Sequence, residues 1–144
     1  MKLLALLLAL LSMVAVAAPP EPVKSEYLET TGGGFLIARG ERAYYAMNFR
    51  IIKELPEEYV LKFSFQNPKR RSPVIEDTRN LKIEGTEIAV QSPILECIKN
   101  RKKYEVIVDI YSDKSESEKI GHHQQKIELR VPADVLEQFG VKTC

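Results

Sequence analysis

The chain has 144 residues, which is the usual length of a single domain. Its 21 basic and 20 acidic residues give a formal net charge of +1, and loss of Lys2 with the leader described below would leave 20 of each. This balance argues against a nucleic-acid binder, which needs surplus Lys and Arg to neutralise phosphates. Two cysteines are also too few for a small disulfide scaffold.

Residues 1–17 have the features of a signal peptide. Lys2 supplies a positive charge, residues 3–11 are almost entirely apolar, and Ala15-Val16-Ala17 gives the small-x-small pattern of a cleavage site. The apolar run is shorter than the roughly 20 residues that span a bilayer. We therefore expect cleavage after Ala17 and a soluble product, either secreted or periplasmic, that does not span the membrane. Residues 18–24 then form a proline-rich leader.

Alternation of apolar and polar residues predicts an antiparallel β domain over residues 25–131. The clearest strands are expected at 43–51, 59–66 and 104–111, and weaker ones at 74–77, 81–84, 87–91 and 123–131. The triplet Gly32-Gly33-Gly34 lacks the Lys-Ser/Thr of a phosphate-binding loop and predicts a bend or bulge. Pro132 opens a short helix over 133–139 that Gly140 ends, so residues 132–144 form a C-terminal helix and tail.

Short strands separated by turns at this spacing predict an all-β fold, a single antiparallel β-sandwich followed by a short C-terminal helix. Residues 98–108 sharpen the prediction, because Ile98 precedes Tyr104 by six positions and Tyr104 begins a Y-x-V-x-V run. This segment resembles the E–F corner and F strand of fibronectin type III and related immunoglobulin-like domains. The resemblance implies an immunoglobulin-like sandwich in which the Tyr104 hydroxyl bonds to the upstream backbone.

Two expectations follow from this resemblance. Replacing Tyr104 by Phe should cost about 1 kcal/mol if the hydroxyl makes that bond. The chain has no Trp, so Phe63 or Phe65 should fill the core position that an early-strand Trp occupies in those families.

Cys97 and Cys144 are the two cysteines of the chain. In an oxidising compartment free thiols tend to pair, so we expect a disulfide between them. It would close a loop of 48 residues (97 through 144) and stabilise the fold by about 4 kcal/mol in the chain-entropy treatment. The alternative is a buried free Cys97 with Cys144 exposed for pairing with a partner chain.

His122 and His123 are the only histidines and are candidate ligands for Cu(II) or Zn(II), with Met47 or a carboxylate. Adjacent residues of a strand point to opposite faces, and no further ligand spacing completes a site. We therefore interpret the pair as the solvated start of a strand, and expect no metal and no cofactor. No arrangement of residues indicates catalysis, so we expect no catalytic residues and no enzyme.

Two basic clusters occupy predicted turns. They are Lys69-Arg70-Arg71, and Lys99 with Arg101-Lys102-Lys103. They are candidates for contact with an anionic partner, and the alternative is that they are simply solvated. Juxtaposition of the two turns at one end of the sandwich would favour the binding interpretation.

The function predicted from the sequence is an exported, non-catalytic binding or accessory module. Its partner would be another protein or a cell-surface component, with no role for nucleic acid. A periplasmic copper or zinc carrier using His122 and His123 is the first alternative, and a secreted hydrolase is the second.

Overall fold

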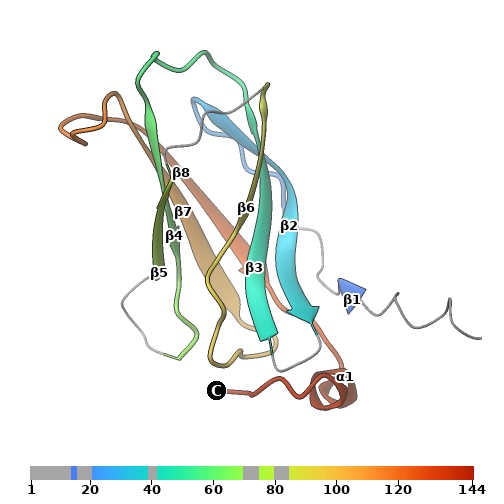
Figure 1. Cartoon of the computed structure of the whole chain (residues 1–144). Helices are drawn as coiled ribbons and strands as arrows, with labels where there is room; N and C mark the ends of the chain where they lie inside the picture. The colour runs from blue at the N-terminus through green and yellow to red at the C-terminus, as the bar shows by residue number, and fades with distance from the viewer. Residues whose placement is uncertain (1–13, 16–20, 39–41, 70–74, 80–84) are drawn as a thin grey trace, which may run out of the picture.

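The computed structural model describes residues 14–15, 21–38, 42–69, 75–79 and 85–144, which form two antiparallel sheets and one short helix (Figure 1). In order across the first sheet lie β1 (Val14–Ala15), β2 (Leu28–Ala38), β3 (Arg42–Ile51) and β6 (Glu87–Gln91). In order across the second lie β5 (Ile75–Arg79), β4 (Val60–Phe65), β7 (Lys103–Tyr111) and β8 (Lys119–Glu128). The helix α1 (Ala133–Gln138) follows β8. The predicted all-β fold with a short C-terminal helix is confirmed, whereas the immunoglobulin-like assignment stays a prediction.

The strands with the clearest alternation bury the residues that the pattern assigns to the core. On β3 the buried side chains are Ala43, Tyr45, Met47 and Phe49. On β7 they are Tyr104, Val106, Val108 and Ile110, and on β4 they are Leu61, Phe63 and Phe65. Val60, which the alternation assigns to the other face of β4, is buried as well. Both phenylalanines expected to replace the missing Trp are therefore in the core.

Aromatic side chains of the two sheets contact each other across this core. The ring of Tyr45 stacks on that of Phe65 with centroids 5.6 Å apart, and Phe35 meets Tyr104 edge-on at 5.8 Å. Such pairs add about 0.5–1.5 kcal/mol beyond the area they bury. The inner faces of the two sheets thus share one hydrophobic cluster.

The triplet Gly32-Gly33-Gly34 lies within β2, a strand that the apolar pattern does not predict. The pairing of β2 with β3 shifts register between Thr30 and Gly32, which confirms the expected bulge. Gly33 has φ +141°, and a Cβ there would lie 2.6 Å from the carbonyl oxygen of Ala46. Only glycine allows β2 to continue past this point.

Among the remaining strands, β6 coincides with the predicted strand at 87–91 and β5 overlaps the one expected at 74–77. The strand expected at 81–84 lies outside the described residues. The helix ends as predicted, because Gly140 has φ 68° and its N–H donates to the carbonyl of Glu137 at 2.9 Å. Within the described residues, no helix is both long and apolar enough to cross a membrane.

Candidate functional site

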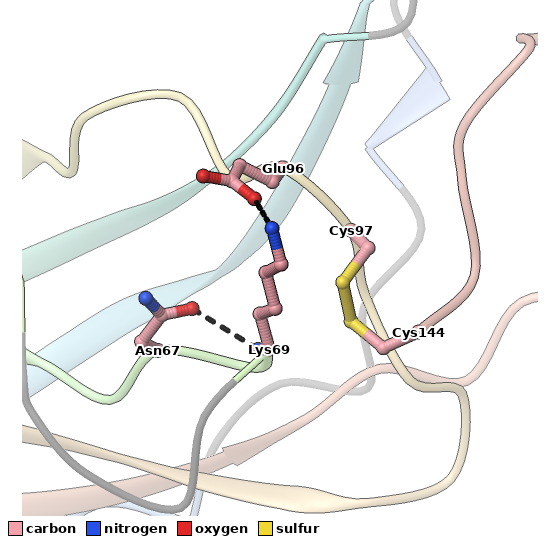
Figure 2. Close-up of a disulfide and its surroundings, with 5 residues drawn as sticks. All are labelled: Asn67, Lys69, Glu96, Cys97 and Cys144. Carbon is pink, nitrogen blue, oxygen red and sulfur yellow. Dashed lines mark hydrogen bonds and ion pairs between the residues drawn. A yellow bond between two sulfur atoms is a disulfide. The ribbon is translucent and has the colours of Figure 1, made fainter.

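The C-terminal tail is joined to the loop before β7 by a disulfide between Cys97 and Cys144, whose Cα atoms lie 5.1 Å apart (Figure 2). The predicted bridge is therefore confirmed, and Cys97 and Cys144 are not free thiols. The N–H of Ile98 donates to the carbonyl of Lys142 at 3.0 Å, and the N–H of Cys144 donates back to Ile98 at 3.1 Å. These contacts hold the tail alongside the loop.

A second attachment of the same loop runs through Asn100. Its Oδ1 accepts hydrogen bonds from the N–H of Val131 at 3.0 Å and of Arg101 at 3.1 Å, and its Nδ2 donates to the Val131 carbonyl. The N–H of Arg101 also donates to Leu129 at 2.7 Å. The loop before β7 is thus fixed both by the tail and by the segment that follows β8. We call this region the stapled end.

The loop that follows β4 reaches the stapled end as well. The ammonium group of Lys69 pairs with the carboxylate of Glu96, the residue before Cys97 (Figure 2). The backbone N–H of Lys69 is held by Oδ1 of Asn67 at 3.0 Å. The two turns that carry the basic clusters therefore meet at one end of the fold. Arg70 and Arg71 lie outside the described residues.

Four exposed residues of the loop before β7 and the start of β7 carry the second basic cluster. These corner cations are Lys99, Arg101, Lys102 and Lys103. Lys102 lies over the ring of Tyr104, 5.6 Å from its centroid. Arg101 is held at φ 57°, a left-handed conformation that the contacts of Asn100 support. The loop therefore presents its cations from a fixed backbone.

Arg130, after β8, adds a further cation at this end. It binds the carboxylate of Glu128 at 3.0 Å, and this hydrogen bond is the main cause that lowers the Glu128 pKa, with further contributions from Lys103 and Arg101. Arg130, Lys103 and Arg101 therefore act on the Glu128 carboxylate, and Lys99 and Lys102 bring the number of cations named at this end of the fold to five. Beyond them the tail adds Lys142, and α1 adds Asp134 and Glu137. A surface hollow of about 590 Å³ lies among five residues of this region, namely Arg101, Glu128, Arg130, Val131 and Pro132.

The corner pair Ile98 and Tyr104 is fully buried, but the hydrogen bond implied by the resemblance is not formed. The Tyr104 hydroxyl has no hydrogen-bond partner among the described residues. Burial is the main cause that raises its pKa, and the backbone of Lys99 partly offsets this shift. The expectation that this hydroxyl ties the corner to the upstream backbone is therefore corrected.

The two histidines lie inside β8, which begins at Lys119, so the interpretation of both as a solvated strand start is wrong for His123. His122 is exposed and its Nδ1 lies 2.7 Å from Oδ1 of Asp109. His123 as a whole residue is 1% exposed, and its Nε2 lies 2.8 Å from the Thr30 hydroxyl and its Nδ1 2.8 Å from the Ser25 hydroxyl. These two hydroxyls allow a polar ring to be buried.

The environment of His123 favours the neutral imidazole. The hydroxyl of Ser25 donates to the carbonyl of Leu28 at 3.2 Å, so its oxygen is left to accept the Nδ1 proton of His123. The Thr30 hydroxyl then donates to Nε2. Burial lowers the pKa of His123, and the neighbouring His122 lowers it further.

As the strand geometry predicts, the two imidazoles point to opposite faces of β8 and do not chelate one ion. Met47, proposed as a third ligand, is buried on β3. In the part of the chain that the structure describes, no three His, Cys, Asp or Glu side chains gather into a metal-binding group. The geometry gives the metal-carrier alternative no support.

Two residues of the stapled end, Arg130 and Asn100, are not indicated by the sequence alone. Arg130 joins the corner cations only because β8 returns antiparallel to β7 and brings Glu128 opposite Lys103. Asn100 acts through the backbone of Val131, a contact between residues far apart in the sequence. No local pattern indicates either one.

Comparison with known proteins returned no match: no protein family, no curated protein and no solved structure resembles this chain closely enough to be significant.

Proposed function

We propose that this protein is an exported, non-catalytic binding module that uses its stapled end to dock an acidic surface of another protein. The observation that carries the proposal is the exposure of the corner cations on a loop held by the disulfide and by Asn100. The meeting of this loop with the turn of Lys69 at one end supports the same interpretation.

Export is supported by two independent features. The leader over residues 1–17 has the pattern of a cleavable signal peptide. The disulfide is of a kind that persists in oxidising compartments and is rare in reducing ones. A secreted or periplasmic location accounts for both.

The physical advantage of the stapled end is pre-organisation. Ordering a side chain or loop on binding costs about 0.5–1.5 kcal/mol per immobilised side chain, and a loop already fixed at its backbone avoids part of this cost. Surplus positive charge in one place also accelerates encounter with an acidic partner, and salt screens this effect. Binding should therefore weaken as ionic strength rises.

The proposal is tested with the oxidised protein lacking residues 1–17 and a fluorescent poly-glutamate as a model acidic surface. A variant carrying Lys99→Gln, Arg101→Gln and Lys102→Gln removes three corner cations. A matched control carries Lys53→Gln, Lys114→Gln and Lys119→Gln, which remove the same charge at the opposite end of the strands. A sulfated polysaccharide replaces poly-glutamate in a parallel titration.

We expect the first variant to lose about tenfold or more in affinity for poly-glutamate at low salt, and the control to stay within about threefold of wild type. Equal losses in the two variants would show a response to net charge alone and would contradict the proposal. Tighter binding of the polysaccharide, with the same dependence on the corner cations, would replace the protein partner by a carbohydrate one.

A further inference from the structure

β2 pairs with β3 along one edge, and its other edge is covered in two short stretches. Near its start, the N–H of Thr30 donates to the carbonyl of Val23 at 2.9 Å, and Lys24 bridges to Glu29. Near its end, β1 pairs antiparallel with β2, setting Val14 against Ile37 and Ala15 against Leu36 (Figure 1). The end of β2 thus has a strand partner drawn from residues 1–17.

Cleavage after Ala17 would remove β1 and leave Leu36 and Ile37 without that partner. The new N-terminal segment reads Ala18-Pro19-Pro20-Glu21-Pro22. Proline has no N–H to donate to a strand ladder, so a segment with three prolines in five residues is a poor replacement for β1. The vacated edge would be left to a strand from another chain.

The outer face of the first sheet beside this edge suits an apolar guest. A hollow of about 580 Å³ lies over it, lined among others by Gly34, Leu36, Ala46 and Ala89, with the polar side chains of Asn48 and Gln91 at its β3 and β6 side. The small residues Gly34, Ala46 and Ala89 leave room over the sheet surface. A guest strand would place alternate side chains next to Leu36 and the others next to Phe35 and Ile37.

From these observations we propose that the edge of β2 from Gly34 to Ala38 is a strand-addition site. Its ligand is an extended, apolar, proline-free polypeptide segment of a partner chain that pairs antiparallel, as β1 does. Backbone hydrogen bonds supply affinity in this mode of recognition, and alternate side chains supply selectivity. The site depends on leader cleavage and is separate from the stapled end.

The test uses the oxidised protein lacking residues 1–17 and a labelled synthetic peptide of residues 11–17 extended by a solubilising lysine tail. We expect saturable binding and slowed hydrogen exchange of backbone amides within residues 34–38. A peptide with Val14→Pro and Val16→Pro should not bind, because it lacks two N–H donors.

Two protein variants locate the site. Leu36→Lys places a charge on the half-buried outer face of the edge and should weaken peptide binding by about tenfold or more. Ile52→Lys makes the same kind of change at an exposed position outside the edge and should bind as wild type does. Far-UV circular dichroism confirms that both variants are folded.

Failure to bind the peptide, or protection of amides outside residues 34–38, would overturn the proposal. Protection of the same amides without peptide, together with a concentration-dependent dimer, would also overturn it by identifying the occupant as a second copy of β2. The corner-cation variant should bind the peptide normally, so the outcome here is independent of the docking function proposed above.

Discussion

The hydroxyls of Tyr45 and Tyr104 are both enclosed by the core, but only that of Tyr45 has a partner. It donates to the carbonyl of Gln66 at 2.7 Å, whereas the Tyr104 hydroxyl is unpaired. A hydrogen bond of this type contributes about 1 kcal/mol net, and an unpaired buried hydroxyl contributes nothing comparable. We therefore expect Tyr45→Phe to lower the free energy of unfolding by about 1 kcal/mol, and Tyr104→Phe to change it by less than about 0.5 kcal/mol.

The denaturant midpoints of the two variants, measured side by side, check this difference. Each variant is the control for the other, because both remove a single oxygen atom. A larger loss for Tyr104→Phe than for Tyr45→Phe would restore the corner hydrogen bond implied by the resemblance to fibronectin type III domains.

His123 makes stability depend on pH in a defined direction. Its pKa in the folded state is lowered, chiefly by burial, so below about pH 6.5 the unfolded chain takes up a proton that the folded chain resists. Stability contributed by this group is fully present above the unfolded pKa and is lost as the pH falls toward the folded pKa. The slope from one such group is at most about 1.4 kcal/mol per pH unit.

Urea titrations between pH 7 and pH 5 should show that the wild type loses more stability than a His123→Gln variant over that range. A His122→Gln variant should keep most of the wild-type dependence, because burial is the main cause of the lowered His123 pKa and the neighbouring His122 is the smaller one. If His123→Gln and wild type lose stability in parallel, the buried imidazole is not the source of the dependence.

At the scale of the elements, the strands that the sequence predicts are those with one buried and one exposed face. Alternation in β3, β4 and β7 is strong because their inward positions carry large apolar or aromatic side chains. β2 was not predicted because its centre is three glycines, and the first four residues of β8, 119–122, were missed because none of them is buried and they carry no apolar alternation. Hydroxyl partners from Ser25 and Thr30, which are distant in sequence, make burial of His123 possible.

The disulfide should be the largest single contribution to holding the C-terminal tail. Its residues are separated by 47 positions, and closing a loop of that length restricts the unfolded chain by about 4 kcal/mol in the entropy treatment. We expect a Cys97→Ala, Cys144→Ala variant to unfold at a lower denaturant concentration, with a loss approaching that value. Wild type treated with reductant should behave like the variant.

A loss below about 1 kcal/mol would contradict this assignment and would mean that the hydrogen bonds of Ile98 and the contacts of Asn100 hold the tail without help. Amide hydrogen exchange of residues 142–144 in the same variant distinguishes a released tail from a general loss of stability.

At the scale of the whole molecule, the sequence predicts which residues carry the charge of the stapled end but not that they come together. The corner cations form a run that is visible in the sequence. Because the chain has two cysteines, the sequence also predicts that they pair with each other. The position of Lys69 beside Glu96 and of Arg130 beside Glu128 depends on how the sheets return. Contacts of this kind depend on how the strands are connected and paired. The periodicity of a single segment does not predict them.

The export account predicts the mass of the mature chain. Protein recovered from its native compartment without reductant should match residues 18–144 less two hydrogens, since cleavage follows Ala17 and both thiols are oxidised. Alkylation before reduction should add no mass. A chain that keeps residues 1–17, or that gains two alkyl groups, would contradict export with an internal disulfide.

The docking surface is tested most directly by site-specific photo-crosslinking of the exported protein in its own compartment. A photoreactive residue replaces Lys102 at the stapled end in one variant and Lys114, in the turn between β7 and β8, in another. The account predicts a discrete adduct from position 102 whose crosslinked partner peptide is rich in Asp and Glu, and none from position 114. Adducts of equal yield from both positions, or a position-102 adduct to a neutral or basic peptide, would contradict it.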